Sequence, residues 1–321
     1  MARALVTGAT GFLGSYLGET LRRDGWELRG TYLGRPTSPA GCPSWPVAEL
    51  RSVDVTQRGS IDRAIEEFRP DAIFHFAGQA FVQRSFEDPA GTFAVNLLGT
   101  LHALEAMRRY APGASFVFAG SGTEYGAPTQ VPTPEEAPLL PTSPYGASKA
   151  AADLLCYQYH RSFDSRVLRL RIFGTTGPGK QGDSCNDFAS QVARLESDHV
   201  AGAIRVGNLD RKRDIADVRD AVRAMVAVER RGVAGEAYNL GSGEARSVRS
   251  VLDSLLALAR RPIVVETDTA RLRPGDEPVH LASIEKLRGL GWSPSIPFER
   301  TLADILELWR ERNNGSGVAQ P

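Results

Sequence analysis

Apolar runs and segments of helical period alternate along the first half of the chain. The segments that predict strands are residues 4–6, 26–32, 72–79 and 115–118, with residues 53–55 at the end of another. The segments with apolar side chains three and four positions apart, as in an amphipathic helix, are residues 15–21, 61–68 and 92–109. The run at 72–77 has no polar alternation, which is typical of a parallel strand covered on both faces. The pattern predicts an α/β fold with a doubly wound parallel sheet.

Three glycines, spaced three apart, separate the first strand from the first helix. Gly8 permits a tight turn, Gly11 a close approach of a ligand, and Gly14 close packing of helix on strand. Backbone N–H groups and the positive end of the helix dipole then lie beside any pyrophosphate bound there. A glycine triad alone fits a simple turn, but the flanking strand and helix favour a dinucleotide site. The expected cofactor contacts in this turn are Gly8, Thr10, Gly11, Phe12, Leu13 and Gly14.

The end of the second strand bears on which dinucleotide is bound. An NAD site places a carboxylate there, about 20 residues past the glycines, for the ribose 2′-hydroxyl. Residues 31–34 carry no carboxylate, and Arg35 follows them. A guanidinium suits a 2′-phosphate, so NADP is favoured over NAD, unless Arg35 is a solvated loop residue. The other expected cofactor contacts are Asp54 and Val55, near the adenine, and Ala77 and Gly78, where small residues let the cofactor lie against the backbone.

A serine, a tyrosine and a lysine are candidates for the chemistry. Ser121 follows the strand at 115–118, and Tyr145 and Lys149 stand four residues apart, on one face of the next expected helix. A phenol has a pKa near 10, and a neighbouring cation favours the phenolate and brings that pKa towards neutrality. Ser121 would donate a hydrogen bond to the reacting oxygen. A surface Tyr–Lys pair is the alternative, but lysine is rare in this chain, which has only Lys149, Lys180, Lys212 and Lys286.

Composition limits the possible partners. The 321 residues carry 38 Lys and Arg against 38 Asp and Glu, so no overall field favours nucleic acid or an anionic membrane. No apolar run is long enough to span a membrane, and Met1 leads almost directly into a strand without room for a signal peptide. The three cysteines (42, 156 and 185) suggest neither a disulfide framework nor a zinc site. We therefore expect a cytoplasmic protein with no metal.

The motifs together resemble a known family. Thr7-Gly8-x-x-Gly11-x-x-Gly14, Ser121 and Tyr145-x-x-x-Lys149 are similar to the extended short-chain dehydrogenases/reductases, the NAD-dependent epimerase/dehydratase superfamily, which act on nucleotide sugars. Residues 206–214, 217–220, 238–243 and 272–277 resemble the branch of GDP-mannose 4,6-dehydratase and GDP-4-keto-6-deoxy-D-mannose reductase. The resemblance covers about residues 3–312.

The resemblance implies two domains and a dimer. Residues 1–172 plus about 211–241 would form a Rossmann domain for NADP, and residues 173–210 and 242–312 a smaller C-terminal α/β domain for the nucleotide sugar. Helices at 96–109 and 147–163 resemble the pair that builds a dimeric four-helix bundle. The polar, glycine-containing residues 313–321 are expected to be disordered.

The resemblance also implies substrate contacts. Arg213 and Arg273 would hold the diphosphate, as guanidiniums suit it. The hexose would meet Arg84 and Ser85, and the loop at 182–188, with Asn186, would cover the sugar nucleotide. Gly174 replaces an asparagine that commonly contacts the substrate, so one hydrogen bond of the family's substrate site is missing. The remaining candidates beside Ser121 are Thr123 and Glu124.

The residues after Ser121 favour one activity within the branch. Dehydratases carry an acid one or two positions beyond the Ser/Thr, where this chain has Gly122 and Thr123, with Glu124 one residue out of place. The resemblance then implies an NADPH-dependent reductase of the C4 ketone of GDP-4-keto-6-deoxy-D-mannose, giving GDP-D-rhamnose or GDP-6-deoxy-D-talose. Tyr145 would protonate the oxygen and contact the cofactor, and Lys149 would lower the tyrosine's pKa and contact the cofactor ribose. The alternatives are a nucleotide-sugar 4-epimerase or GDP-mannose 4,6-dehydratase with tightly bound NAD(P), and a non-catalytic NADP-binding sensor.

Overall fold

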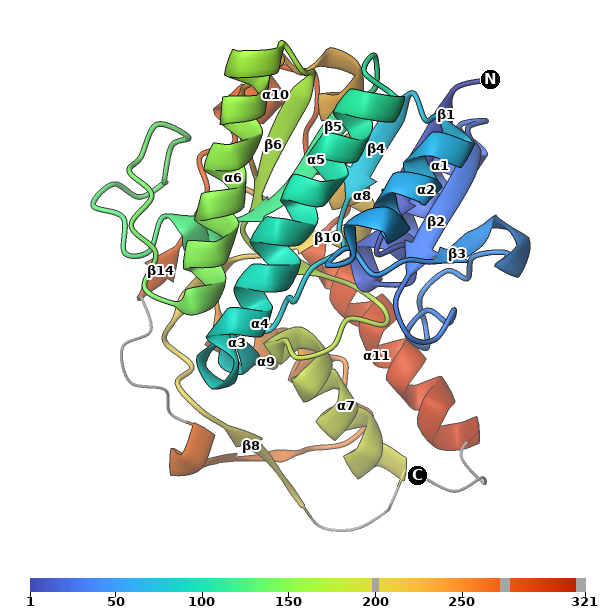
Figure 1. Cartoon of the computed structure of the whole chain (residues 1–321). Coiled ribbons are helices and arrows are strands. Elements are labelled where there is room, and N and C mark those ends of the chain that lie inside the picture. The colour runs from blue at the N-terminus through green and yellow to red at the C-terminus, as the bar shows by residue number, and fades with distance from the viewer. Residues whose placement is uncertain (198–201, 272–277, 316–321) are drawn as a thin grey trace.

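The computed structural model describes residues 1–197, 202–271 and 278–315, and it is built around one parallel sheet of seven strands (Figure 1). The strand order is β11-β6-β5-β4-β1-β2-β3. Every neighbouring pair in this sheet is parallel. The strands are β1 (Arg3–Thr7), β2 (Glu27–Tyr32), β3 (Leu50–Ser52), β4 (Ala72–His75), β5 (Ser115–Ser121), β6 (Val167–Ile172) and β11 (Ala237–Leu240). The order reverses at β1 and β4, which is where ligands bind in a doubly wound sheet.

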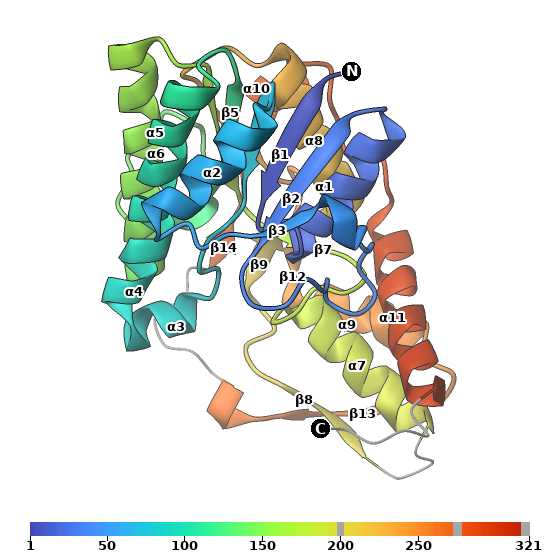
Figure 2. The ribbon, with the colours of Figure 1, turned by 45° about the vertical axis from the view of Figure 1, so that its right-hand side comes forward.

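Helices cover both faces of the sheet because the strands are apolar on both sides. Leu5, Ile73 and Phe116 face one core, and their chain neighbours Val6 and Phe74 face the other. Helices α2 (Arg58–Phe68), α5 (Gly99–Tyr110) and α6 (Pro144–Phe163) cover the first face, and α1 (Phe12–Arg23) and α8 (Val218–Arg231) cover the second (Figure 2). This arrangement confirms the predicted doubly wound α/β fold.

The helical segment expected at 92–109 has more than one part. It begins as α4 (Pro89–Phe93), continues through a π-helical turn (Ala94–Leu98) and ends as α5. A short helix, α3 (Val82–Glu87), precedes it. Such π turns change which side chains share a helix face, and here the turn carries the buried Asn96 towards the catalytic helix α6.

A smaller unit lies below the carboxyl ends of the strands (Figures 1 and 2). Its core forms between α7 (Ser184–Ser197), α9 (Val248–Ala257) and α11 (Phe298–Gly315). The short strands pair as β8 (Ala203–Val206) with β13 (Val264–Thr267), β10 (Ala216–Asp217) with β7 (Thr175–Thr176), and β9 (Lys212–Asp214) between β12 (Ala245–Ser247) and β14 (Val279–His280). The short helix α10 is Glu285–Arg288. None of the helices in the described part of the chain is long and apolar enough to cross a membrane.

The prediction for the C-terminal tail was wrong for residues 313–315. Helix α11 continues to Gly315, because its apolar side, with Leu302, Ile305 and Leu306, is buried in the core of the smaller unit. A helix held along its length in this way extends past its last core residue. Residues 316–321 lie outside the described part of the chain.

Candidate active site

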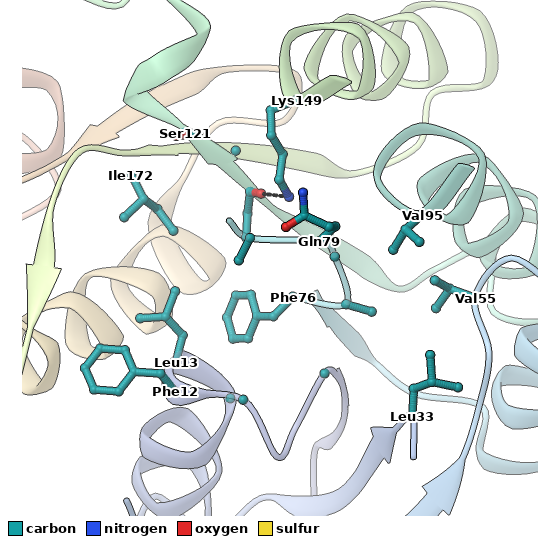
Figure 3. Close-up of a pocket in the computed structure, with 18 of the residues that line it drawn as sticks. Phe12, Leu13, Leu33, Val55, Phe76, Gln79, Val95, Ser121, Lys149 and Ile172 are labelled. Atoms are coloured by element: carbon teal, nitrogen blue, oxygen red, sulfur yellow. Dashed lines mark hydrogen bonds between the residues drawn. The ribbon is translucent and has the colours of Figure 1, made fainter. Parts of the chain in front are cut away.

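A cavity of about 550 Å³ opens at the carboxyl ends of β1, β4 and β5. Phe12 and Leu13 lie at one end of the view in Figure 3, opposite Ser121 and Lys149, with Phe76 between them. Leu33, Val55 and Val95 lie to one side (Figure 3). Of the cofactor and catalytic candidates, those that line the cavity are Gly8, Gly11, Phe12, Leu13, Gly14, Asp54, Val55, Ala77, Gly78, Ser121, Tyr145 and Lys149. The structure therefore brings the glycine turn and the serine–tyrosine–lysine group to one cavity.

The glycine turn has a geometry that side chains would destroy. Gly8 has φ +66°, in the left-handed region that favours glycine. A methyl group on Gly14 would overlap the carbonyl oxygen of Gly8 and lie 2.8 Å from the Ala9 Cα, so the close packing of α1 on the turn requires glycine there. Gly11 caps α1 without a side-chain hydrogen bond. The first N–H groups of α1 are thus available to an anion, which fits the pyrophosphate of a dinucleotide.

Two of the expected cofactor contacts do not line the cavity. Thr10 lies half-buried in the turn, outside the cavity lining. Arg35 is exposed beyond β2, and among the described residues it makes no hydrogen bond or ion pair. Asp54 does line the cavity, but one of its carboxylate oxygens accepts hydrogen bonds from the Thr56 backbone N–H at 2.9 Å and hydroxyl at 2.7 Å.

Sheet and helix ends position the catalytic candidates. Ser121 is the last residue of β5, and its hydroxyl lies 2.9 Å from the Thr123 hydroxyl. Pro144 begins α6, and the Ser143 hydroxyl caps it by accepting from the Gly146 N–H, so Tyr145 stands in the first turn. Lys149, one turn later, donates to the Ala119 carbonyl oxygen at 2.9 Å. A Tyr–Lys pair on the first turns of a helix beside a strand end can bind and protonate a carbonyl oxygen.

The protein groups alone do not lower the pKa of Tyr145, contrary to our expectation. Burial raises the pKa of the phenol to about 12, against a hydrogen bond with Ser121 that lowers it, and the Glu124 carboxyl raises it further. Burial also lowers the pKa of the Lys149 ammonium to about 8, although Glu124 opposes this shift. Removal of the phenol from water is the largest cause of its raised pKa, and the Lys149 ammonium donates to the Ala119 carbonyl oxygen. Tyr145 is therefore in its proton-donating form at neutral pH.

Glu124 does not face the substrate side, so this expectation needs correction. Its side chain is fully buried under β5, where Oε1 accepts from the Ser121 N–H at 2.6 Å. The other oxygen, Oε2, lies 3.5 Å from the Arg171 Nε without a hydrogen bond. Burial and the nearby Asp153 raise the pKa of Glu124 well above its usual value, although Arg171 opposes the shift. The physical reason is the turn Gly122–Glu124, in which Glu124 caps Ser121 and points into the core.

Two other expected substrate contacts are also engaged inside the protein. Ser85 is fully buried, and its hydroxyl donates to the Val82 carbonyl oxygen at 2.6 Å. Asn186 is buried as well: its amide nitrogen donates to the Gly177 carbonyl oxygen at 3.2 Å and its oxygen accepts from the Trp309 ring N–H at 3.2 Å. The Ser85 hydroxyl is thus bonded within α3, and the Asn186 amide is bonded to Gly177 and Trp309.

Of the remaining substrate candidates in the described residues, only Gly174 lines the cavity. Arg84 is exposed on α3, Thr123 is half-buried beside Ser121, and Arg213 is half-buried on β9. Arg273 lies outside the described residues. Gly174 lines the cavity, and a side chain there would overlap the carbonyl oxygen of Asp214. Glycine is therefore required at position 174 because two backbone segments approach each other closely there.

Asn96 also belongs to the site, although no motif in the sequence singles it out. Its amide oxygen accepts from the Gln79 N–H at 2.8 Å, and its amide nitrogen donates to the Gln79 carbonyl oxygen at 3.1 Å and to the Ser148 hydroxyl at 2.9 Å. Asn96 thus ties the cavity-lining segment Ala77–Gln79 to helix α6, beside Lys149. A lone amide within an otherwise apolar helical segment was the signal that could have found it.

The fold and this cavity define the class of protein. The chain is an NAD(P)-dependent enzyme, an extended short-chain dehydrogenase/reductase. It has the seven-stranded doubly wound sheet of this class, with a glycine turn and a Tyr–Lys pair at one cavity. A family model described as GDP-mannose 4,6 dehydratase matches residues 5–305. The chain belongs to the GDP-mannose 4,6-dehydratase family.

Relatives of several activities share the whole length of the chain. A Pseudomonas aeruginosa protein named GDP-6-deoxy-D-mannose reductase is 33% identical over 316 residues, which cover 97% of this chain and 98% of the relative. The solved structure of RMD from Pseudomonas aeruginosa complexed with NADPH superposes with a TM-score of 0.85 at 31% identity, over 97% and 100% of the chains. The Thermus thermophilus UDP-glucose 4-epimerase complex with NAD gives 0.81 at 30% identity, over 98% and 100%.

Proposed function

We propose that the protein is an NADPH-dependent reductase of the C4 ketone of GDP-4-keto-6-deoxy-D-mannose, with a GDP-6-deoxyhexose as product. The observation that carries this proposal is the set of side chains that line the cavity. Ser121, Tyr145 and Lys149 line it, and its only carboxylate among the described lining residues is Asp54, at the expected adenine end. Hydrogen-bond donors suffice for the reduction of a ketone, whereas a dehydratase also needs an acid beside C5 and C6.

The chain's own groups have separate tasks in this reaction. When bound, NADPH supplies the hydride for the C4 carbon. Ser121 holds the C4 oxygen by a hydrogen bond, and Tyr145 gives it a proton, because the raised pKa of the phenol keeps that proton in place until negative charge develops. Lys149 would hold the cofactor ribose, its ammonium exchanging the Ala119 carbonyl for a ribose hydroxyl.

The charge near β2 supports NADP over NAD. The end of β2 and the residues after it, 31–34, contain no carboxylate for a ribose 2′-hydroxyl. Arg35 is exposed and unpaired among the described residues, and so it is available to a 2′-phosphate. On the substrate side, the GDP-6-deoxy-D-mannose reductase relative supports a GDP-linked sugar, with Arg213 and Arg273 as the proposed ligands of its diphosphate.

The experiment compares turnover with and without added cofactor. Purified protein is supplied with the ketosugar nucleotide and NADPH, and absorbance at the reduced nicotinamide band is followed together with the amount of ketone left. We expect one NADPH oxidised for each ketone consumed. An epimerase would convert a sugar nucleotide without added NADPH and without net oxidation of the cofactor. That result would contradict the reductase proposal. Unchanged ketone in the presence of bound NADPH would instead favour a sensor.

We also propose a homodimer through α5 and α6, which pack side by side (Figure 1). These helices and the turn before them expose large apolar side chains: Leu98 (47% exposed), Leu154 (56%), Tyr157 (43%) and Phe163 (48%). Exposed apolar side chains on neighbouring helices favour a partner of the same kind, a second helix pair. Light scattering is expected to give twice the chain mass, and the Leu154→Glu variant half that value. A monomeric wild-type chain would contradict the proposal.

A further inference from the structure

The segment Gly177–Asp183, here called the crossing loop, contributes Lys180 to the lining of the cavity. On the cofactor side, the Pro178 carbonyl oxygen accepts from the Tyr16 hydroxyl at 2.8 Å, and a methyl group on Gly179 would lie 2.5 Å from the Cys42 Sγ. On the opposite side, Gly182 lies beside the ring of Phe81, where a methyl group would come within 3.9 Å. The crossing loop therefore lies between Tyr16 and Phe81, and the Tyr16 hydroxyl holds its backbone at Pro178.

Lys180, in the middle of the crossing loop, lines the cavity and is half-buried. It makes no hydrogen bond or ion pair with any described residue. Its Nζ lies 5.0 Å from the centroid of the Phe12 ring. Burial lowers the pKa of this ammonium, whereas the nearby Asp183 carboxylate raises it without a direct contact. The Asp183 oxygens accept from the Thr176 hydroxyl at 2.7 Å and the Asn186 N–H at 2.8 Å. Burial has the larger effect on this pKa, so holding the ammonium charged has a cost that a bound anion would remove.

The position of Phe12 indicates which anion would reach Lys180. Phe12 is the first residue of α1, directly after Gly11, so its ring stands at the helix end that presents unpaired N–H groups. The other lysine of the cavity, Lys149, lies at the opposite end and donates to the Ala119 carbonyl. Lys180 is thus the cation placed at the glycine turn, where a phosphate group held by backbone N–H groups would lie.

We propose that Lys180 binds the pyrophosphate of the dinucleotide from the crossing loop, opposite the glycine turn. The pyrophosphate would then be held from two sides, by backbone N–H groups of α1 and by a side-chain cation. This inference rests on the nicotinamide cofactor of the proposed function, but it does not depend on which sugar is reduced. It assigns a cofactor-binding role to a residue outside the glycine motif.

The test measures dinucleotide affinity in variants of the full chain. Lys180→Gln removes the charge and Lys180→Arg keeps it, and each is titrated by calorimetry with NADPH, NADH, ADP-ribose and GDP. We expect Lys180→Gln to weaken NADPH, NADH and ADP-ribose by the same factor, about 10- to 100-fold, as for the loss of one hydrogen bond to a charged group. Lys180→Arg should keep most of the affinity, and GDP binding should be unchanged. The loss should shrink as salt is raised.

Two matched controls separate this role from general effects. Lys286→Gln removes a lysine on α10 that pairs with Glu236 far from the cavity, and it should leave every affinity unchanged. Arg35→Gln should weaken NADPH and spare NADH, because a 2′-phosphate contact is specific to NADPH.

Three results would overturn the role of Lys180. They are a loss confined to NADPH, a loss confined to GDP, and equal affinities in the wild type and Lys180→Gln. A wild-type chain that binds no dinucleotide would overturn the cofactor and Lys180 together. If the wild type binds NADPH but does not reduce the ketosugar, the reductase proposal fails and the affinity comparison still decides the role of Lys180.

Discussion

Glu124 contacts the backbone of the catalytic serine, Ser121. Replacing Glu124 therefore tests quantitatively how much this contact stabilises the protein. Its Oε1 accepts from the buried Ser121 N–H at 2.6 Å. Leucine at this position has no acceptor, so the Ser121 N–H would be left buried without a partner, at a cost of about 1–3 kcal/mol. Arg171 would keep Asp153, whose carboxylate lies 3.0 Å away, so the rest of the network survives. At pH 5 we expect Glu124→Leu to lower the free energy of unfolding by about this amount.

Glutamine at position 124 isolates the effect of ionisation. Its side-chain oxygen can still accept from Ser121, but it cannot ionise. In the wild type, burial raises the pKa of Glu124 above its unfolded value, so the folded state binds the proton more tightly and stability falls as pH rises from the unfolded pKa towards the folded pKa. Each pH unit in this window costs up to about 1.4 kcal/mol. Glu124→Gln should therefore differ least from the wild type near pH 5, the lowest pH measured, and become progressively more stable than the wild type as the pH rises.

The assay is urea unfolding of the wild type, Glu124→Gln and Glu124→Leu at pH values from 5 to 9. The difference between the wild type and Glu124→Gln gives the ionisation term, and the difference between the two variants gives the hydrogen bond to Ser121. Parallel pH profiles of the wild type and Glu124→Gln would refute the raised pKa. A Glu124→Leu variant as stable as Glu124→Gln at pH 5 would refute the importance of the Ser121 contact.

Three further substitutions test the cavity itself. Tyr145→Phe removes the proton donor, so steady-state kinetics should show kcat lower by about 10²- to 10⁴-fold with NADPH affinity kept; an active variant would contradict the role of the phenol. Gly14→Ala forces a methyl group into the backbone of the glycine turn, at about 1–3 kcal/mol in stability, and calorimetry should detect no NADPH binding. Gly174→Asn, which restores the residue common in the family, would overlap the Asp214 carbonyl oxygen and should lower the melting temperature; an unchanged temperature would show that the two segments separate easily.

The features that could be predicted from the sequence depend on local rules. The parallel sheet follows from continuous apolar runs such as Ala72–His75, which need cover on both faces. The glycine turn follows from a fixed spacing between a strand and a helix, and the pairing of Tyr145 with Lys149 from the period of a helix. In each case, a few neighbouring residues determine the geometry, whatever the rest of the chain does.

The features that could not be predicted depend on contacts between distant segments. Glu124 was expected at the substrate, but a single turn after β5 directs it inward to Arg171, which comes from β6. Asn186 was expected in the ligand loop, but Trp309 of α11 occupies its oxygen. Lys180 reaches the cavity only because the crossing loop packs against Tyr16 and Cys42. Such directions follow from tertiary packing, which no local pattern in the sequence records.

The central claim is that this cavity reduces a ketone at C4 of a sugar nucleotide with a proton from Tyr145. Its most direct measurement is product analysis, by mass and NMR, after incubation with GDP-4-keto-6-deoxymannose and NADPH deuterated at the nicotinamide C4. The account predicts a GDP-6-deoxyhexose with one deuterium at C4 of the sugar from the wild type, and none from Tyr145→Phe within the same time. A product without deuterium at C4, or equal labelling by the Tyr145→Phe variant, would contradict it.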